Sequence, residues 1–131
     1  MRDILLRVGL KQFYEADEPA DIFSCLGGRT PDVTILDWDF PALSGEEVLR
    51  LIRNPKLSPV PRMPVIVTMA RPTRDAVLRA VEVGANEIVA KPFSPKVVWQ
   101  HLQGIVQEPR VFMDSGGILV PAPRVVDNSI V

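Results

Sequence analysis

The sequence has little of several residue types that would narrow its function, with one cysteine and one histidine in 131 residues. The single Cys25 cannot form a disulfide within the chain and has no cluster of metal ligands around it. This pattern favours a buried structural thiol in a reducing compartment. No apolar run approaches the roughly 18 residues that span a bilayer, and Arg2, Asp3 and Arg7 stand where a signal peptide would have its apolar core. We therefore expect a cytoplasmic protein that is neither exported nor inserted in a membrane.

The sequence also lacks an excess of either charge. Fifteen basic residues balance sixteen acidic ones, which gives a formal net charge of −1, and no block of like charge is present. Nothing in this balance favours nucleic acid as a partner. What the chain does have is a hydrophobic fraction of 47%, which suits one compact domain with its own core.

Short β-rich runs alternate with segments of helical spacing along the chain. This alternation is typical of a parallel sheet covered by helices, so we predict an α/β fold. The predicted strands are 12–15, 32–36, 65–68 and 87–90, and the predicted helices are 1–8, 19–26, 46–53, 73–83 and a last one that starts at Pro95.

Polar residues follow three successive predicted strands: Asp37, Thr68 and Lys91. Because parallel strands all end at one edge of a sheet, we expect these residues to converge there. A carboxylate can attack phosphorus, a hydroxyl can donate a hydrogen bond to a phosphoryl oxygen, and an ammonium can neutralise its charge. The set therefore predicts a phospho-acceptor site. Taken singly, each residue has a simpler interpretation: a turn cap, an ordinary strand residue and a solvated lysine.

Longer motifs surround these three residues. They are Ile35 to Pro41 with Gly45, then Val65 to Ala70, Val83 to Asn86, and Lys91 to Phe93. Through them the chain resembles, from Gly9 to about Val106, the CheY-like receiver domain of two-component response regulators. The resemblance implies a flavodoxin-like, doubly wound parallel sheet in a three-layer α/β/α arrangement.

The resemblance also implies a role for each site residue. Asp37 would be phosphorylated by a histidine kinase or a phosphotransfer protein, Thr68 would be the switch hydroxyl, and Lys91 would contact the phosphoryl oxygens. Mg²⁺ would be bound by Asp37 and by the backbone carbonyl of Asp39, since a hard cation takes oxygen ligands and bridges carboxylate to phosphate. At the position of Ile88 many receivers carry an aromatic residue that rotates when the switch threonine moves. Because isoleucine has no such rotation, we expect this chain to change its output surface in another way.

A receiver begins with an apolar strand that ends in two acidic residues, whereas Met1 here falls within the expected first helix. We therefore expect an N-terminally incomplete fold with a weak Mg²⁺ site and poor phosphorylation by small donors. A missing central strand would leave backbone groups unpaired, at about 1–3 kcal/mol for each buried group. Three explanations stay open: a truncated sequence, another segment of the chain that fills the gap, or a strand exchanged with a partner chain.

The segment Arg110 to Val120 is the candidate for filling that gap. Two apolar runs flank Asp114-Ser115-Gly116-Gly117 there, which predicts a β-hairpin at 111–120. The expected organisation is a receiver domain at 1–108 followed by a tail at 109–131. That tail is too short for a helix-turn-helix, so we expect no direct DNA binding.

The functional expectation is a stand-alone receiver that is not an enzyme beyond its own phosphorylation and dephosphorylation. It would signal by binding a downstream protein target, and a homodimer could form through the last helices or by strand exchange. The alternative is a pseudo-receiver that serves as an interaction module independent of phosphorylation. Replacing Asp37 with asparagine distinguishes the two, because only the first should lose regulation.

Overall fold

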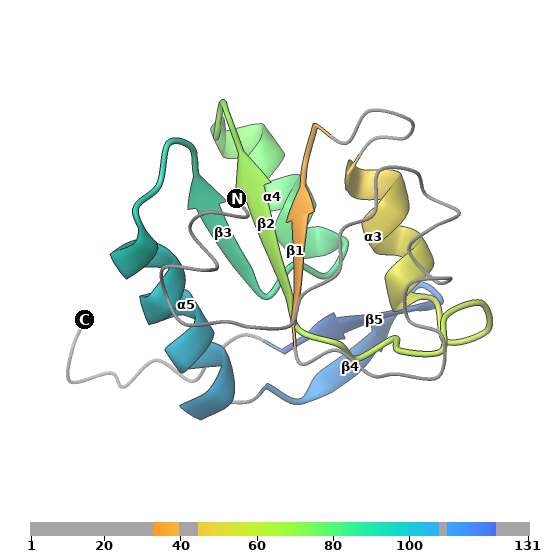
Figure 1. Cartoon of the computed structure of the whole chain (residues 1–131). Helices are drawn as coiled ribbons and strands as arrows, with labels where there is room; N and C mark the ends of the chain where they lie inside the picture. The colour runs from red at the N-terminus through yellow and green to blue at the C-terminus, as the bar shows by residue number, and fades with distance from the viewer. Residues whose placement is uncertain (1–32, 40–44, 108–109, 123–131) are drawn as a thin grey trace, which may run out of the picture.

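The computed structural model describes residues 33–39, 45–107 and 110–122 (Figure 1). The helices and strands predicted before residue 33 lie outside these ranges, as does most of the turn after the first described strand. The elements in chain order are β1 (Thr34–Asp37), α3 (Gly45–Arg53), β2 (Val65–Met69), α4 (Arg74–Glu82), β3 (Glu87–Ala90), α5 (Pro95–Gln107), β4 (Phe112–Ser115) and β5 (Ile118–Pro121).

The first three described strands form one parallel sheet in the order β1-β2-β3, which confirms the predicted architecture over this part of the chain (Figure 1). In the middle strand β2 all five residues are buried, which explains its unbroken apolar sequence Val65-Ile66-Val67. Helices α3 and α4 connect the strands in turn. Because the strands are parallel, their carboxyl ends lie at one edge of the sheet.

Helix α3 supplies much of the core. Val48, Leu49 and Ile52 recur at helical spacing and are fully buried, as that spacing predicts. They belong to one apolar cluster with alternate residues of β2, namely Val65, Val67 and Met69. This cluster fixes α3 against one face of the sheet.

Helix α4 begins and ends as its sequence predicts. The Thr73 hydroxyl oxygen accepts a hydrogen bond from the Ala76 amide at 3.2 Å, so Thr73 is the N-cap. After the C-cap at Val83, Gly84 has a φ of +109°, a left-handed conformation that glycine adopts without a side-chain clash. The helix buries only Ala80 completely, so its hold on the sheet is weaker than that of α3.

Helix α5 begins at Pro95, as predicted, and packs beside β3. The Ser94 hydroxyl accepts from the Val97 amide at 3.3 Å, and Val98 is buried. None of the helices in the described segments combines the length and the apolar composition that a bilayer crossing requires.

Arg53, at the end of α3, is fully buried, which its sequence context does not predict. Its Nε donates to the Gly84 carbonyl at 2.9 Å, and its Nη2 donates to Asn86 Oδ1 at 2.6 Å. Its Nη1 donates to the carbonyls of Pro61 and Met63 at 3.0 and 2.5 Å. One side chain therefore ties the end of α3 to the proline-rich connection and to the segment that leads into β3.

The hairpin predicted in the tail is present: β4 and β5 are antiparallel and join at Gly116 and Gly117, both with positive φ. Its proposed place in the sheet is wrong. In the described part of the chain, β4 and β5 pair with each other and form a separate two-stranded sheet. Figure 1 shows the hairpin at the end of the parallel sheet where the strands begin, and Ile118 packs against the core there.

Candidate functional site

The three predicted site residues lie on adjacent strands at the carboxyl edge of the sheet. Asp37 ends β1 and is in register with Thr68 on β2. Lys91 directly follows β3, and its amide donates to the Met69 carbonyl at 2.8 Å, which extends the pairing of β3 with β2 by one residue. The parallel topology thus brings together residues that are far apart in sequence.

Asp37 and Lys91 are in direct contact. The Lys91 ammonium donates to Asp37 Oδ2 at 2.5 Å, and both side chains are partly exposed. The other carboxylate oxygen, Oδ1, accepts from the Asp39 amide at 3.0 Å. Because each oxygen has a donor, the carboxylate is held in one orientation at the edge of the sheet while it stays accessible from solvent.

Thr68 is buried, at 3% exposure, in the central strand. Its carbonyl accepts from the Trp38 amide at 2.9 Å, so the residue after Asp37 is tied to the backbone of Thr68. Thr68 therefore lies next to Asp37, on the neighbouring strand and in the same register. The Lys91–Pro92 peptide that follows β3 is cis.

The turn after Asp37 depends on a close backbone approach at Gly45. The Gly45 amide donates to the Trp38 carbonyl at 2.9 Å, and a Cβ at Gly45 would lie 2.6 Å from the Trp38 Cα. Glycine is therefore required by space at this position, where α3 begins. Beside the turn, the structure forms a pocket of about 300 Å³ lined by Trp38, Asp39, Met69, Ala70 and Arg71.

Two oxygen donors suited to a divalent cation belong to this edge: the Asp37 carboxylate and the Asp39 backbone carbonyl. Nowhere in the described ranges do three or more histidine, cysteine, aspartate or glutamate side chains gather to hold a metal. Mg²⁺ usually keeps several waters and binds through one or two carboxylates. The chemistry of these two donors fits such a hydrated ion.

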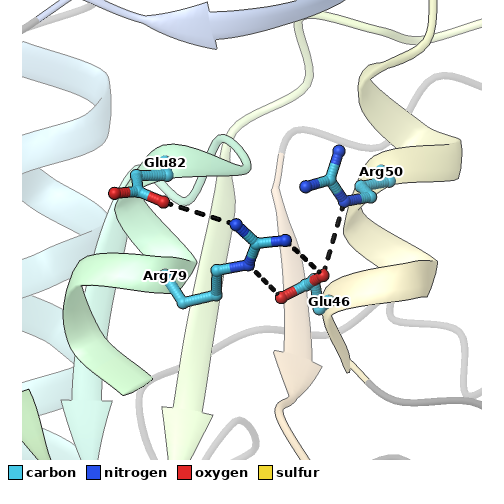
Figure 2. Close-up of polar contacts among 4 residues, drawn as sticks. All are labelled: Glu46, Arg50, Arg79 and Glu82. Carbon is cyan, nitrogen blue, oxygen red and sulfur yellow. Dashed lines mark hydrogen bonds and ion pairs between the residues drawn. The ribbon is translucent and has the colours of Figure 1, made fainter. Parts of the chain in front are cut away.

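An ion-pair network links α3 and α4 (Figure 2), and sequence reasoning missed it. The Glu46 carboxylate accepts from Arg79 Nε and, at 3.0 Å, from Arg79 Nη2. Arg50 and Glu82 each add a contact at 3.5 Å. The hydrogen bond to Arg79 lowers the pKa of Glu46, and the same bond raises the pKa of Arg79. Sequence spacing could indicate the Glu46–Arg50 pair but not the contact between helices.

Comparisons with known proteins agree with this geometry. The family model described as the response regulator receiver domain matches residues 1–103. The phosphate regulon transcriptional regulatory protein PhoB of Pseudomonas aeruginosa is 30% identical over 93 residues, which are 71% of this chain and 40% of that protein. The chemotaxis protein CheY of the same species is 26% identical over 82% of this chain and 85% of its own length. The chain thus spans less than half of PhoB and most of CheY.

A solved structure shows the same fold. It is the receiver domain of the sensor histidine kinase PA1611 from Pseudomonas aeruginosa PAO1, described with a magnesium ion coordinated in its active site cleft. The similarity has a TM-score of 0.68 at 19% identity and covers 82% of this chain and 85% of that one. At this identity the likeness establishes the CheY-like α/β fold alone.

Proposed function

Because the chain belongs to the response regulator receiver domain family of two-component signal transduction, we propose that Asp37 accepts a phosphoryl group and that this changes the binding of a partner protein. The observation that carries the proposal is the contact between Lys91 Nζ and Asp37 Oδ2 at 2.5 Å. Lys91 places a positive charge against the solvent-accessible carboxylate of Asp37, and Thr68 lies beside them at the edge of the parallel sheet. This arrangement is suited to binding a phosphoryl group.

The transfer is a displacement at phosphorus. One oxygen of Asp37 forms a bond to phosphorus as the bond between phosphorus and the donor nitrogen of a phosphohistidine breaks. The electron pair of that bond stays on the nitrogen, which takes a proton from water. Lys91 neutralises the negative charge of the phosphoryl oxygens, and the Thr68 hydroxyl donates a hydrogen bond to one of them.

The Asp37 carboxylate and the Asp39 carbonyl are the described groups that would hold Mg²⁺. Such an ion would supply positive charge that offsets the repulsion between the carboxylate and an incoming phosphoryl group. The donor in this proposal is a histidine kinase or a phosphotransfer protein, and the receiver of the signal is a downstream protein. The match along most of a chemotaxis CheY protein supports action through docking of a partner.

Intact mass after incubation with Mg²⁺ and a phosphohistidine donor, namely a phosphorylated phosphotransfer protein, tests the proposal. The wild-type chain should gain the mass of one phosphoryl group, and Asp37→Asn should gain none. Asp39→Asn is the matched control, because only the backbone of Asp39 takes part, and it should still be labelled.

Labelling of Asp37→Asn would contradict the assignment of the acceptor. If the wild type remains unlabelled with acetyl phosphate and with a phosphohistidine donor, while it still binds its partner, the chain is a phosphorylation-independent interaction module.

A further inference from the structure

Helices α3 and α4, which follow β1 and β2, differ in how much apolar surface they bury against the sheet. Helix α3 buries Val48, Leu49 and Ile52 completely, whereas α4 buries only Ala80 to that extent. Two apolar side chains of α4, Leu78 and Val81, are 48% and 53% exposed. Since apolar burial is the main force that holds a helix on a sheet, α4 has less to fix its position than α3.

An ion pair connects α4 to α3. Glu46 in the first turn of α3 receives two hydrogen bonds from the forked guanidinium of Arg79 in the last turn of α4 (Figure 2). The Glu46 and Arg79 side chains are 27% and 47% exposed, so the pair lies at the surface and its strength depends on the salt concentration. Each charge also lies at the helix end whose dipole it complements.

This ion pair lies close in sequence to the turn at Trp38 and Asp39, which follows Asp37. Trp38 follows Asp37 directly, its carbonyl accepts from the Gly45 amide at 2.9 Å, and Glu46 is the next residue. A side chain at Gly45 has no room because its Cβ would meet the Trp38 backbone at 2.6 Å. The backbone after Asp37 is therefore in direct contact with the first residue of α3.

We propose that the Glu46–Arg79 bridge positions α4 and couples its position to the phosphorylation state of Asp37. The coupling rests on the function proposed above. A phosphoryl group brings up to two negative charges and takes over Lys91, so the Asp37–Asp39 turn has to readjust. The two hydrogen bonds from the Arg79 guanidinium to the Glu46 carboxylate weaken steeply with distance and angle. A small shift of Glu46 therefore releases Arg79. Helix α4 and its exposed Leu78 and Val81 then become mobile, which alters the surface that a partner meets.

Amide hydrogen exchange in α4 tests the positioning role in the full chain without phosphorylation. Glu46→Gln should exchange about threefold to fivefold faster than wild type along 74–82. The change in α3 should be smaller, because α3 loses only the Arg50 contact and the dipole interaction of Glu46. The control Glu82→Gln leaves the fork intact and should match wild type. Arg79→Lys keeps the charge but loses the fork, so it should fall between the two. About 0.5 M salt should accelerate exchange in wild type but not in Glu46→Gln.

Equal exchange in Glu46→Gln and wild type, or equal acceleration in Glu82→Gln, would overturn the positioning role. The coupling is tested by the same measurement after phosphorylation at Asp37. Exchange in α4 should rise in wild type toward the Glu46→Gln level and should not rise further in Glu46→Gln. An identical response of both proteins would refute the coupling.

A chain that takes no phosphoryl group would refute the proposed function and the coupling together. The exchange data on the unphosphorylated protein would still decide whether the Glu46–Arg79 bridge positions α4.

Discussion

The guanidinium carbon of Arg53 lies 4.7 Å from the centre of the Phe112 ring, and this contact joins the end of α3 to the first strand of the hairpin. The hairpin follows the residues that match the receiver family, 1–103. Burial lowers the pKa of Arg53 to about 9, which is still above neutral pH, so the side chain stays cationic. The hairpin is therefore packed on a buried charge and is an integral part of this fold.

Arg53→Met should be strongly destabilising, because it removes the hydrogen bonds that Arg53 donates to four acceptors, although Asn86 Oδ1 keeps its bond from the Val65 amide. The four acceptors are the carbonyls of Pro61, Met63 and Gly84 and the Asn86 side-chain oxygen. We expect a loss of about 3 kcal/mol in the free energy of unfolding in urea. The exposed Arg50→Met should change it by less than about 0.5 kcal/mol. Similar losses in the two variants would show that the buried hydrogen bonds contribute no more than a surface contact.

Phe112→Ala should lower the free energy of unfolding by about 2 kcal/mol, because it removes both a partly buried ring and the cation–π contact. The neighbouring Val111 is 77% exposed, so Val111→Ala should leave the unfolding midpoint nearly unchanged. Urea unfolding of the full chain measures both. A hairpin that is only loosely attached would give two variants of wild-type stability.

Gly45→Ala should disturb the turn that follows Asp37. The added methyl group meets the Trp38 backbone, and we expect a loss of about 1–3 kcal/mol together with slower phosphorylation of Asp37. Gly116→Ala is the comparison. The added methyl group has open space there, but residue 116 has a φ of +62°, which is strained for alanine. We expect a loss of about 1 kcal/mol in the free energy of unfolding, with no effect on phosphorylation, because Gly116 lies in the hairpin turn. Thermal unfolding and the rate of mass gain separate the two, and wild-type behaviour of Gly45→Ala would exclude the clash.

The Glu46–Arg79 bridge should make the free energy of unfolding depend on pH. The hydrogen bond from Arg79 lowers the folded pKa of Glu46 below its unfolded value, so the unfolded state takes up the proton first. The stabilisation is present above the unfolded pKa of 4.5 and is lost as pH falls through the folded pKa. Between about pH 5 and about pH 3, wild type should lose more stability than Glu46→Gln. Parallel urea midpoints for the two proteins across this range would contradict the shift.

Much of the described fold follows from local rules. The predicted strand 87–90 coincides with β3, the last helix begins at Pro95, and Thr73 caps α4, because turn, cap and apolar patterns act over a few neighbouring residues. The convergence of Asp37, Thr68 and Lys91 was also predictable, since a parallel sheet leaves all its carboxyl ends at one edge. The roles assigned to these residues stay predictions.

The contacts between elements were decided by the tertiary structure alone. The sequence predicts that α3 has an apolar face and that the tail forms a hairpin. It does not predict that Arg53 is buried under Phe112 or that Glu46 meets Arg79. Periodicity is a property of one element, whereas these contacts depend on how separate elements pack. Strand patterns in the sequence were enough to predict that Asp37, Thr68 and Lys91 meet at one edge of the sheet, whereas the contact between α3 and α4 depends on how the two helices pack.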